Sequence, residues 1–155
     1  MKSTSILLGL VVGMVFFILL PYFFISLNNY FFLPVYSSGL FKISGLICIL
    51  LGIGLFLYCS GLFIILGRGT PAPIEPPKKL VVNGLYKYSR NPIYIGYFLI
   101  LLGEFLSFGQ FLLLIYLFLI IIAINLYISY YEEPILKKRF GKSYENYLKK
   151  IPRWI

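Results

Sequence analysis

Four long apolar runs constrain the fold of this chain more than any other feature of its sequence. They cover residues 6–27, 40–66, 93–108 and 111–131. The third is the shortest, about 24 Å long at the rise of an α-helix, and the other three have the roughly 20 residues that a helix needs to cross a bilayer. Because the bilayer interior offers backbone groups no water, such runs cross it as helices. We therefore predict an all-α integral membrane protein with about four transmembrane helices.

The composition of the 155 residues excludes an ordinary soluble domain, since 60% are hydrophobic and only 12% are charged. The net charge of +9 would suggest nucleic acid in a soluble protein. Here the cations flank the apolar runs, where anionic lipid headgroups are the simpler partner. We expect a single membrane domain over residues 1–155, with membrane lipids and no nucleic acid as partners.

The first two runs and the segment after them have distinct compositions. A cleaved signal peptide is the alternative for the first run. Only Lys2 precedes the run, the run is too long for the apolar part of a typical signal peptide, and no small-residue cleavage site follows, so we expect a retained helix. Glycines in the second run favour close helix packing; they are Gly45, Gly52, Gly54 and Gly61. The proline-rich residues 67–83 cannot form a helix, and they are either a connector or a lip over a site.

The last two runs are separated by Gly109 and predict a tight helical hairpin. Glu104 lies near its turn, either as a functional intramembrane acid or as an interfacial residue that reaches water. Beyond the hairpin, residues 135–151 alternate apolar and basic side chains at helical spacing, interrupted at Gly141. They predict a C-terminal interfacial amphipathic helix.

Charge predicts the topology. Four spans place the N-terminus, the proline-rich loop and the C-terminal tail on one side, which holds every lysine and arginine except Lys42. By the positive-inside rule this side is cytoplasmic. We thus expect a multi-pass protein with both termini in the cytoplasm, and Arg90, Tyr94 and the pair Glu132-Glu133 together on the cytoplasmic face.

Residue types that are missing narrow the chemistry. The chain has no histidine, which removes histidine-dependent catalytic triads and most zinc or haem chemistry. Cys48 and Cys59 lie eleven residues apart in one run, about 16 Å along a helix, too far to bridge. Free thiols and no metal site are expected.

The stretch 84–94 and the acidic pair carry the remaining chemistry. A pocket between them would offer the cation of Arg90, the amide of Asn91, several tyrosines and two carboxylates above apolar helices. This set suits a zwitterionic, partly aromatic ligand, whereas a Glu-Glu pair at the headgroup boundary could equally be an ordinary helix end screened by lysines.

The same residues resemble a known family. The motifs that carry the resemblance are Leu80-Val81-Val82-Asn83-Gly84-Leu85-Tyr86, Arg90-Asn91-Pro92-Ile93-Tyr94, Glu132-Glu133, Phe140-Gly141-Lys142-Ser143-Tyr144, Tyr147 and Ile151-Pro152-Arg153. In this order and spacing they look like the isoprenylcysteine carboxyl methyltransferase family and its bacterial relatives, which also resemble phospholipid N-methyltransferases. The match covers roughly residues 67–153, which would form the cofactor-binding region.

The resemblance implies an integral membrane methyltransferase that binds S-adenosyl-L-methionine on the cytoplasmic side and releases S-adenosyl-L-homocysteine. Its acceptor would be a lipophilic small molecule or a lipid-modified substrate arriving from the bilayer. Carried over by position, the cofactor contacts fall on Lys78, Lys79, Leu80, Val81, Tyr86, Asn91, Pro92, Ile93, Tyr94 and Glu132. Arg90 and Glu133 are the candidate catalytic residues that support the pocket.

The chain departs from the family pattern at two positions. Asn91 stands where the family often has histidine, which could change the cofactor contacts. Ile128 stands where isoprenylcysteine enzymes carry an arginine apt for the substrate carboxylate, and neither neighbour is cationic. The acceptor is therefore open among lipid amines, other lipophilic acids and thiols.

Two alternatives from other functional classes remain at the level of sequence. One is a non-catalytic lipid-binding or assembly protein that retains the fold, and cofactor binding discriminates it from an enzyme. The other is a small transporter, which would need a polar path across the bilayer. Only Glu104 and Asn125 hint at such a path.

Overall fold

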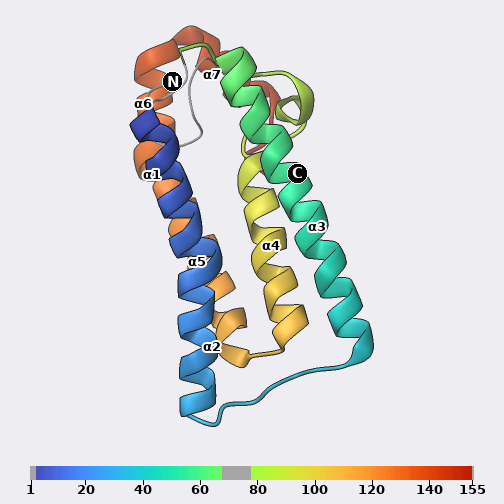
Figure 1. Ribbon diagram of the computed structural model, residues 1–155. Coiled ribbons are helices and arrows are strands. Elements are labelled where there is room, and N and C mark those ends of the chain that lie inside the picture. Colours follow the sequence, from blue (N-terminus) through green and yellow to red (C-terminus); the bar gives the residue numbers. More distant parts are fainter. Residues whose placement is uncertain (1–2, 68–77, 155) are drawn as a thin grey trace.

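The computed structural model describes residues 3–67 and 78–154 and consists of helices that run along one another in an elongated bundle (Figure 1). The first apolar run forms one long helix made of α1 (Ser3–Met14), the π-helical turn η1 (Val15–Leu19) and α2 (Leu20–Tyr30). The second run forms α3 (Gly39–Leu62), which ends in the π-helical turn η2 (Phe63–Gly67).

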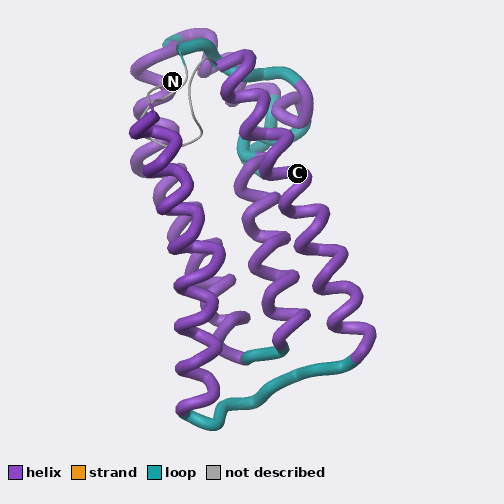
Figure 2. The backbone as a smooth tube through the Cα atoms, in the orientation of Figure 1, coloured by secondary structure: helices purple, strands orange, loops and turns teal. Residues whose placement is uncertain are grey.

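The second half of the chain holds a short 3₁₀ helix, the hairpin and the C-terminal helices. In order these are η3 (Gly84–Lys87), α4 (Pro92–Phe108), α5 (Phe111–Tyr127), the π-helical turn η4 (Ile128–Glu132), α6 (Glu133–Phe140) and α7 (Lys142–Lys150). The connections from α2 to α3 and from α4 to α5 lie at one end of the bundle, while α6, α7 and the start of α1 lie at the other (Figures 1 and 2). The chain thus runs along the bundle four times, and the start of α1 and the C-terminal helices lie at the same end, as the topology of four spans requires.

The predicted multi-pass membrane fold is confirmed. Three helices are long and apolar enough to cross a membrane, over Leu7–Tyr30, Gly39–Gly67 and Phe111–Phe140, and Pro92–Phe108 is a shorter apolar helix. Of the proline-rich segment, residues 68–77 lie outside the described part of the chain. Residues 78–83 are not helical, as expected, whereas Gly67, which the prediction also excluded from a helix, is the last residue of η2.

The acidic pair does not end its helix, in contrast to the sequence-based expectation that a separate amphipathic helix begins after it. The helix continues through η4 into α6 as far as Phe140. Pro134 lies in the first turn of α6. The backbone N–H of Glu133 donates to the carbonyl of Ile128, five residues earlier. Proline has no N–H for the usual bond to the fourth residue back, and the wider π-helical turn accommodates this loss.

The same arrangement recurs at Pro21 in the first helix. It follows η1, where the N–H of Leu20 donates to the carbonyl of Val15, again five residues earlier. Both prolines are thereby accommodated in continuous helices. The expected break at Gly141 is confirmed, since this glycine has φ +51° between α6 and α7.

Glycines bring α3 and α4 into backbone contact, the most extensive helix packing in the described chain. A Cβ atom on Gly52 would lie 2.7 Å from the carbonyl oxygen of Gly96, and one on Gly103 would lie 2.6 Å from that of Gly45. Inside a bilayer, van der Waals contact between small residues replaces the hydrophobic drive that helices have in water. Of the predicted packing glycines, Gly45 and Gly52 serve this contact, whereas Cβ atoms on Gly54 and Gly61 would meet nothing within 4 Å.

A buried amide network joins the loops at the end of the bundle opposite α7. Asn28 Nδ2 donates to Gln110 Oε1 at 2.5 Å and to the Leu33 carbonyl at 3.1 Å, and Asn28 Oδ1 accepts from Leu112 N at 3.0 Å. Gly109 makes the hairpin turn with φ +71°, and a Cβ there would collide with the Tyr36 carbonyl. These bonds fix α4 and α5 relative to the first helix.

Glu104 is buried inside the bundle. Its side chain belongs to α4, its relative exposure is 8%, and its Oε2 atom has no hydrogen-bond partner among the described residues. The two sequence-based alternatives for this residue stay predictions.

The glycine contact generates a stability prediction with a matched control. Gly52→Ala should destabilise the protein by about 1–3 kcal/mol, because the added methyl group overpacks the α3–α4 contact. Gly54→Ala, two residues away in the same helix, should be neutral or stabilising by up to about 1 kcal/mol, because alanine is the better helix former and has room there. Thermal unfolding of the detergent-purified variants measures both. A loss of stability in Gly54→Ala equal to that in Gly52→Ala would contradict the packing.

Candidate functional site

The site is built where η3 and the start of α4 pack onto the end of α3. Gly84 has φ +60°, and a Cβ atom there would lie 2.6 Å from the Tyr58 hydroxyl, so only glycine fits the turn. Beneath it, Cys59, Val81, Tyr86 and Ile93 form a buried apolar cluster. Pro92 occupies the first turn of α4, where its missing N–H costs nothing.

The two carboxylates of the acidic pair have different partners. Glu132 Oε2 accepts a hydrogen bond from the Tyr94 hydroxyl at 2.9 Å. Glu133 Oε1 accepts from Arg90 Nη1 at 2.9 Å, and the two side chains form an ion pair with relative exposures of 12% and 13%. The start of α4 is thus joined to η4 by the neutral donor Tyr94, and the loop before α4 is joined to α6 by the charged donor Arg90. The expected meeting of the two motifs is observed.

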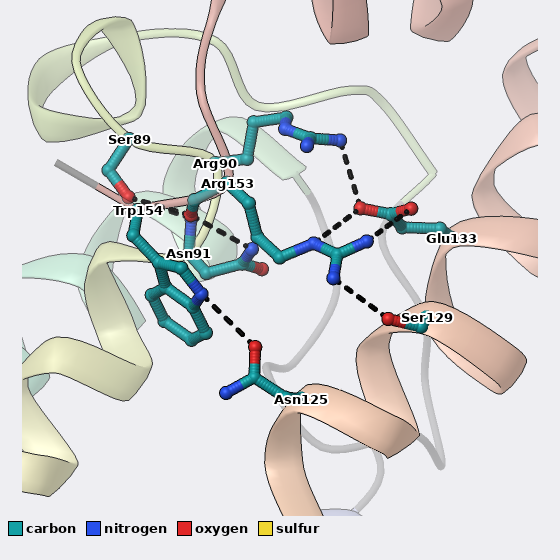
Figure 3. A network of polar contacts seen from close by, with 8 residues as sticks. All are labelled: Ser89, Arg90, Asn91, Asn125, Ser129, Glu133, Arg153 and Trp154. Atoms are coloured by element: carbon teal, nitrogen blue, oxygen red, sulfur yellow. Dashed lines mark hydrogen bonds and ion pairs between the residues drawn. The ribbon is translucent and has the colours of Figure 1, made fainter. Parts of the chain in front are cut away.

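A third segment, residues 151–154 at the C-terminus, completes the site (Figure 3). Arg153 binds Glu133 through two atoms, with Nε donating to Oε1 at 3.2 Å and Nη2 donating to Oε2 at 3.0 Å. Its Nη1 donates to Ser129 Oγ at 2.8 Å. Both oxygens of Glu133 are therefore held by guanidinium groups, and the cluster of Arg90, Glu133 and Arg153 has a net charge of +1.

Backbone bonds fasten the C-terminal segment to the loop before α4. The N–H of Arg90 donates to the Pro152 carbonyl at 3.0 Å. The Arg153 carbonyl accepts from Ser89 Oγ and from Asn91 Nδ2, each at 3.2 Å. These bonds hold the segment close to the start of α4, as Figure 3 shows.

Trp154 extends this connection to the hairpin helices. Its Nε1 atom donates to Asn125 Oδ1 at 3.1 Å, and its ring centroid lies 5.6 Å from that of Phe98. The indole thus contacts both α4 and α5. Asn125, considered above as a possible element of a polar path, is in contact with the indole and with the backbone of its own helix.

The predicted site residues fall into two groups. Tyr94, Glu132, Arg90 and Glu133 make the contacts between motifs described above, and Asn91 binds the C-terminal segment. The others lie around them: Lys78 and Lys79 are exposed, Leu80 is half-buried, and Val81, Tyr86, Pro92 and Ile93 are buried. The side chains of Lys78 and Lys79 do not enter the network of Figure 3.

Sequence reasoning did not assign a role to Arg153, Ser129 or Trp154. No cation stands next to Ile128 in the sequence, but the structure brings the Arg153 guanidinium to Ser129, the residue that follows it. In the sequence, only the closing Ile151-Pro152-Arg153 motif pointed to this segment. The contacts that give Arg153 its role depend on the tertiary structure.

Two buried polar atoms in the site have no hydrogen-bond partner in the described chain, the Tyr86 hydroxyl and Arg90 Nε. Burial raises the pKa of Tyr86 far above its ordinary value, with a smaller contribution from Cys59, so the phenol stays neutral. Tyr147, which donates to the Tyr86 carbonyl at 2.6 Å, has its pKa raised to about 12 by burial. Buried donors in proteins normally have a partner, so these two atoms stand out in the site.

The ion cluster predicts the effect of removing Arg153. Arg153→Ala should lower the free energy of unfolding by about 2 kcal/mol, between the values for buried and for exposed ion pairs, because Glu133 loses two of its three bonds. Arg139→Ala, an exposed arginine on α6, should change it by less than about 0.5 kcal/mol. Thermal unfolding in detergent compares the two, and equal stabilities would show that the cluster does not fasten the C-terminus.

Comparisons with known proteins place the chain in a family. It is 37% identical over 76 residues to the protein-S-isoprenylcysteine O-methyltransferase of Schizosaccharomyces pombe, an alignment that covers 49% of this chain and 32% of that protein. The chain thus aligns with about a third of the length of this curated relative. No solved structure matches the chain. The profile described as phospholipid methyltransferase matches residues 40–143, which include α3, the hairpin and the acidic pair. The resemblance seen in the sequence is confirmed, and the chain belongs to the phospholipid methyltransferase family.

Proposed function

We propose that the protein is an integral membrane methyltransferase that uses S-adenosyl-L-methionine and acts on a lipophilic acceptor. The observation that carries the proposal is the pair of contacts Tyr94–Glu132 and Arg90–Glu133 at one end of an apolar bundle. They join the two motifs that resemble the cofactor-binding residues of the family. Cofactor and acceptor would meet where the polar end of the bundle joins its apolar helices.

The residues present fit this cofactor. S-adenosyl-L-methionine carries a sulfonium, an ammonium, a carboxylate and an adenine. Glu132 provides a carboxylate for a cationic group, and Arg90 keeps the buried Nε–H available for the carboxylate of the ligand. Tyr86 and Tyr94 offer neutral phenol rings to the sulfonium or the adenine.

The remaining predicted contacts would form the walls of the cofactor pocket. They are Lys78, Lys79, Leu80, Val81, Asn91, Pro92 and Ile93. When bound, the cofactor supplies an electrophilic methyl group on sulfur. The protein has to align the acceptor with that group and exclude water, because the transfer disperses charge and creates none. The absence of histidine is consistent with this requirement.

Glu133 acts as a positioning residue in this proposal. Both of its oxygens already accept bonds from guanidinium groups, which leaves it poorly placed to touch a ligand. Its role is to hold Arg90 in place beside Glu132. Arg90 is the member of the pair that would contact the ligand.

An acidic acceptor is the class that the position of Arg153 favours. Glu132 and Glu133 balance Arg90 and Arg153 in formal charge, but the Arg153 guanidinium lies beside Ser129 and so brings a cation close to position 128, which is not itself cationic. The name of the relative from S. pombe describes O-methylation of an isoprenylcysteine. We propose a lipophilic carboxylate of this type as acceptor, with lipid amines and thiols as the competing classes.

The orientation completes the proposal. The basic residues of α6 and α7 lie at the same end of the bundle as the site, and the far end of the described chain has Lys42 as its basic residue. By the positive-inside rule we propose that the termini and the active site lie on the cytoplasmic side.

Cofactor binding is the first test. In calorimetric titrations of the detergent-purified protein, S-adenosyl-L-methionine should bind saturably. Glu132→Gln should weaken binding about tenfold, as expected for the loss of a charge-assisted contact. Tyr94→Ala, which removes the ring proposed to contact the cofactor, should also weaken binding. Glu145→Gln, an exposed acid on α7, should bind like the wild type. Product S-adenosyl-L-homocysteine should compete. A folded wild-type protein that binds neither molecule would favour the non-catalytic lipid-binding alternative.

The acceptor class can be tested by the chemistry of the product. With methyl-labelled cofactor and a panel of lipophilic acids, amines and thiols, we expect label to be transferred to the acids. A methyl ester releases its label as methanol in mild base, whereas N-methyl and S-methyl products retain it. Arg153→Ala should raise KM for the acid about tenfold and should change the affinity for the cofactor by less than that. Base-stable label would instead identify an amine or thiol acceptor.

A further inference from the structure

A cleft of about 300 Å³ lies between α7 and the segment that contains η3. Its walls are formed by Val82, Lys87, Asn146, Tyr147, Lys150 and Ile151. None of the residues assigned to the cofactor lines it. Tyr147 connects the two places, because its hydroxyl donates to the Tyr86 carbonyl inside the site.

The cleft has a polar and an apolar side. Asn146 and Lys150 lie one turn apart on α7 and form a polar stripe. Tyr147 and Ile151, which follows α7, have the same spacing and form an apolar stripe beside it. Val82 extends the apolar stripe, and Lys87 adds a second cation from η3. A ligand that fills this cleft must itself be amphiphilic.

No counter-charge for the two lysines exists among the described residues. Lys87 and Lys150 form no ion pair there, since both ion pairs of that part of the chain belong to Glu133. Glu132 is bonded to Tyr94, and the exposed Glu145 does not line the cleft. Two like charges in one cleft without a carboxylate favour an anion.

We propose that this cleft binds the phosphate of an anionic phospholipid headgroup. Lys87 and Lys150 would contact the phosphate oxygens, Asn146 would donate a hydrogen bond, and the glycerol and first acyl carbons would lie against Val82, Tyr147 and Ile151. The bilayer is the source that the position indicates, because the cleft lies at the end of the bundle where the apolar helices give way to the basic helices α6 and α7. A free phosphate would leave the apolar stripe uncovered.

The bound lipid would be a lasting component of the protein and not the methyl acceptor. Because Tyr147 contacts both the cleft and Tyr86, occupancy would brace η3 against α7. The proposal does not depend on methyl transfer and can be tested by binding alone.

Native mass spectrometry of the purified full-length protein tests this site with short-chain phosphatidylglycerol, and with phosphatidylcholine for comparison. We expect one phosphatidylglycerol to bind saturably. The double variant Lys87→Ala, Lys150→Ala should bind it about thirtyfold more weakly, because each of the two lysines near the headgroup contributes. The control Lys138→Ala, Lys142→Ala removes the same charge from exposed positions outside the cleft and should bind within about twofold of the wild type. Lys87→Arg, Lys150→Arg should retain binding, which separates lost charge from lost folding.

Four results would overturn the proposal. Unchanged affinity in the cleft variant would remove the site, and equal losses in cleft and control variants would reduce it to diffuse surface electrostatics. Displacement of the lipid by millimolar inorganic phosphate would identify a site for soluble anions. Displacement by S-adenosyl-L-methionine would make the cleft part of the cofactor site.

Discussion

The arrangement of this protein's polar end depends on one carboxylate that is shared between two arginines. Glu133 binds Arg90 from the loop before α4 and Arg153 from the C-terminal segment, so a single side chain brings together parts of the chain that are distant in sequence. Glu133 is largely buried, and a buried charge without partners would be costly. The C-terminal segment is therefore part of the site and not a tail beside it.

This cluster can form only if the helices beneath it are held at fixed distances. The glycines of α3 and α4 provide one constraint, because they allow backbone contact at two levels along the helix pair. The amides of Asn28 and Gln110 provide another at the far end, where they tie the hairpin turn to the first helix. A change at either place would move α4, and with it Arg90, Asn91 and Tyr94.

The π-helical turn η4 gives the acidic pair its geometry. It widens the helix just before Pro134, so α5 continues into α6 and Glu132 and Glu133 project from the middle of a long helix. One carboxylate is bonded to a phenol and the other to guanidinium groups. Such a division suits a site in which one acid contacts a cationic ligand and its neighbour positions an arginine, with apolar helices below to receive a lipophilic chain.

The apolar runs were sufficient to predict the spans, the hairpin turn at Gly109 and the break at Gly141, because a bilayer leaves long apolar segments few alternatives to helices and glycine marks the turns. The number of spans and the distribution of charge were sufficient to predict that Arg90 and Tyr94 would lie at the same end as the acidic pair. The continuity of the helix through Pro134 was not predictable, since it depends on a shift to π-helical bonding. Nor was the role of Arg153, Ser129 and Trp154, because contacts over 20 or more residues depend on how the helices pack.

By itself the sequence determined which segments are helical and which polar motifs face each other, through hydrophobicity and local backbone preference. Only the tertiary structure decided which cation reaches Glu133, because that choice depends on where folding places the C-terminal segment.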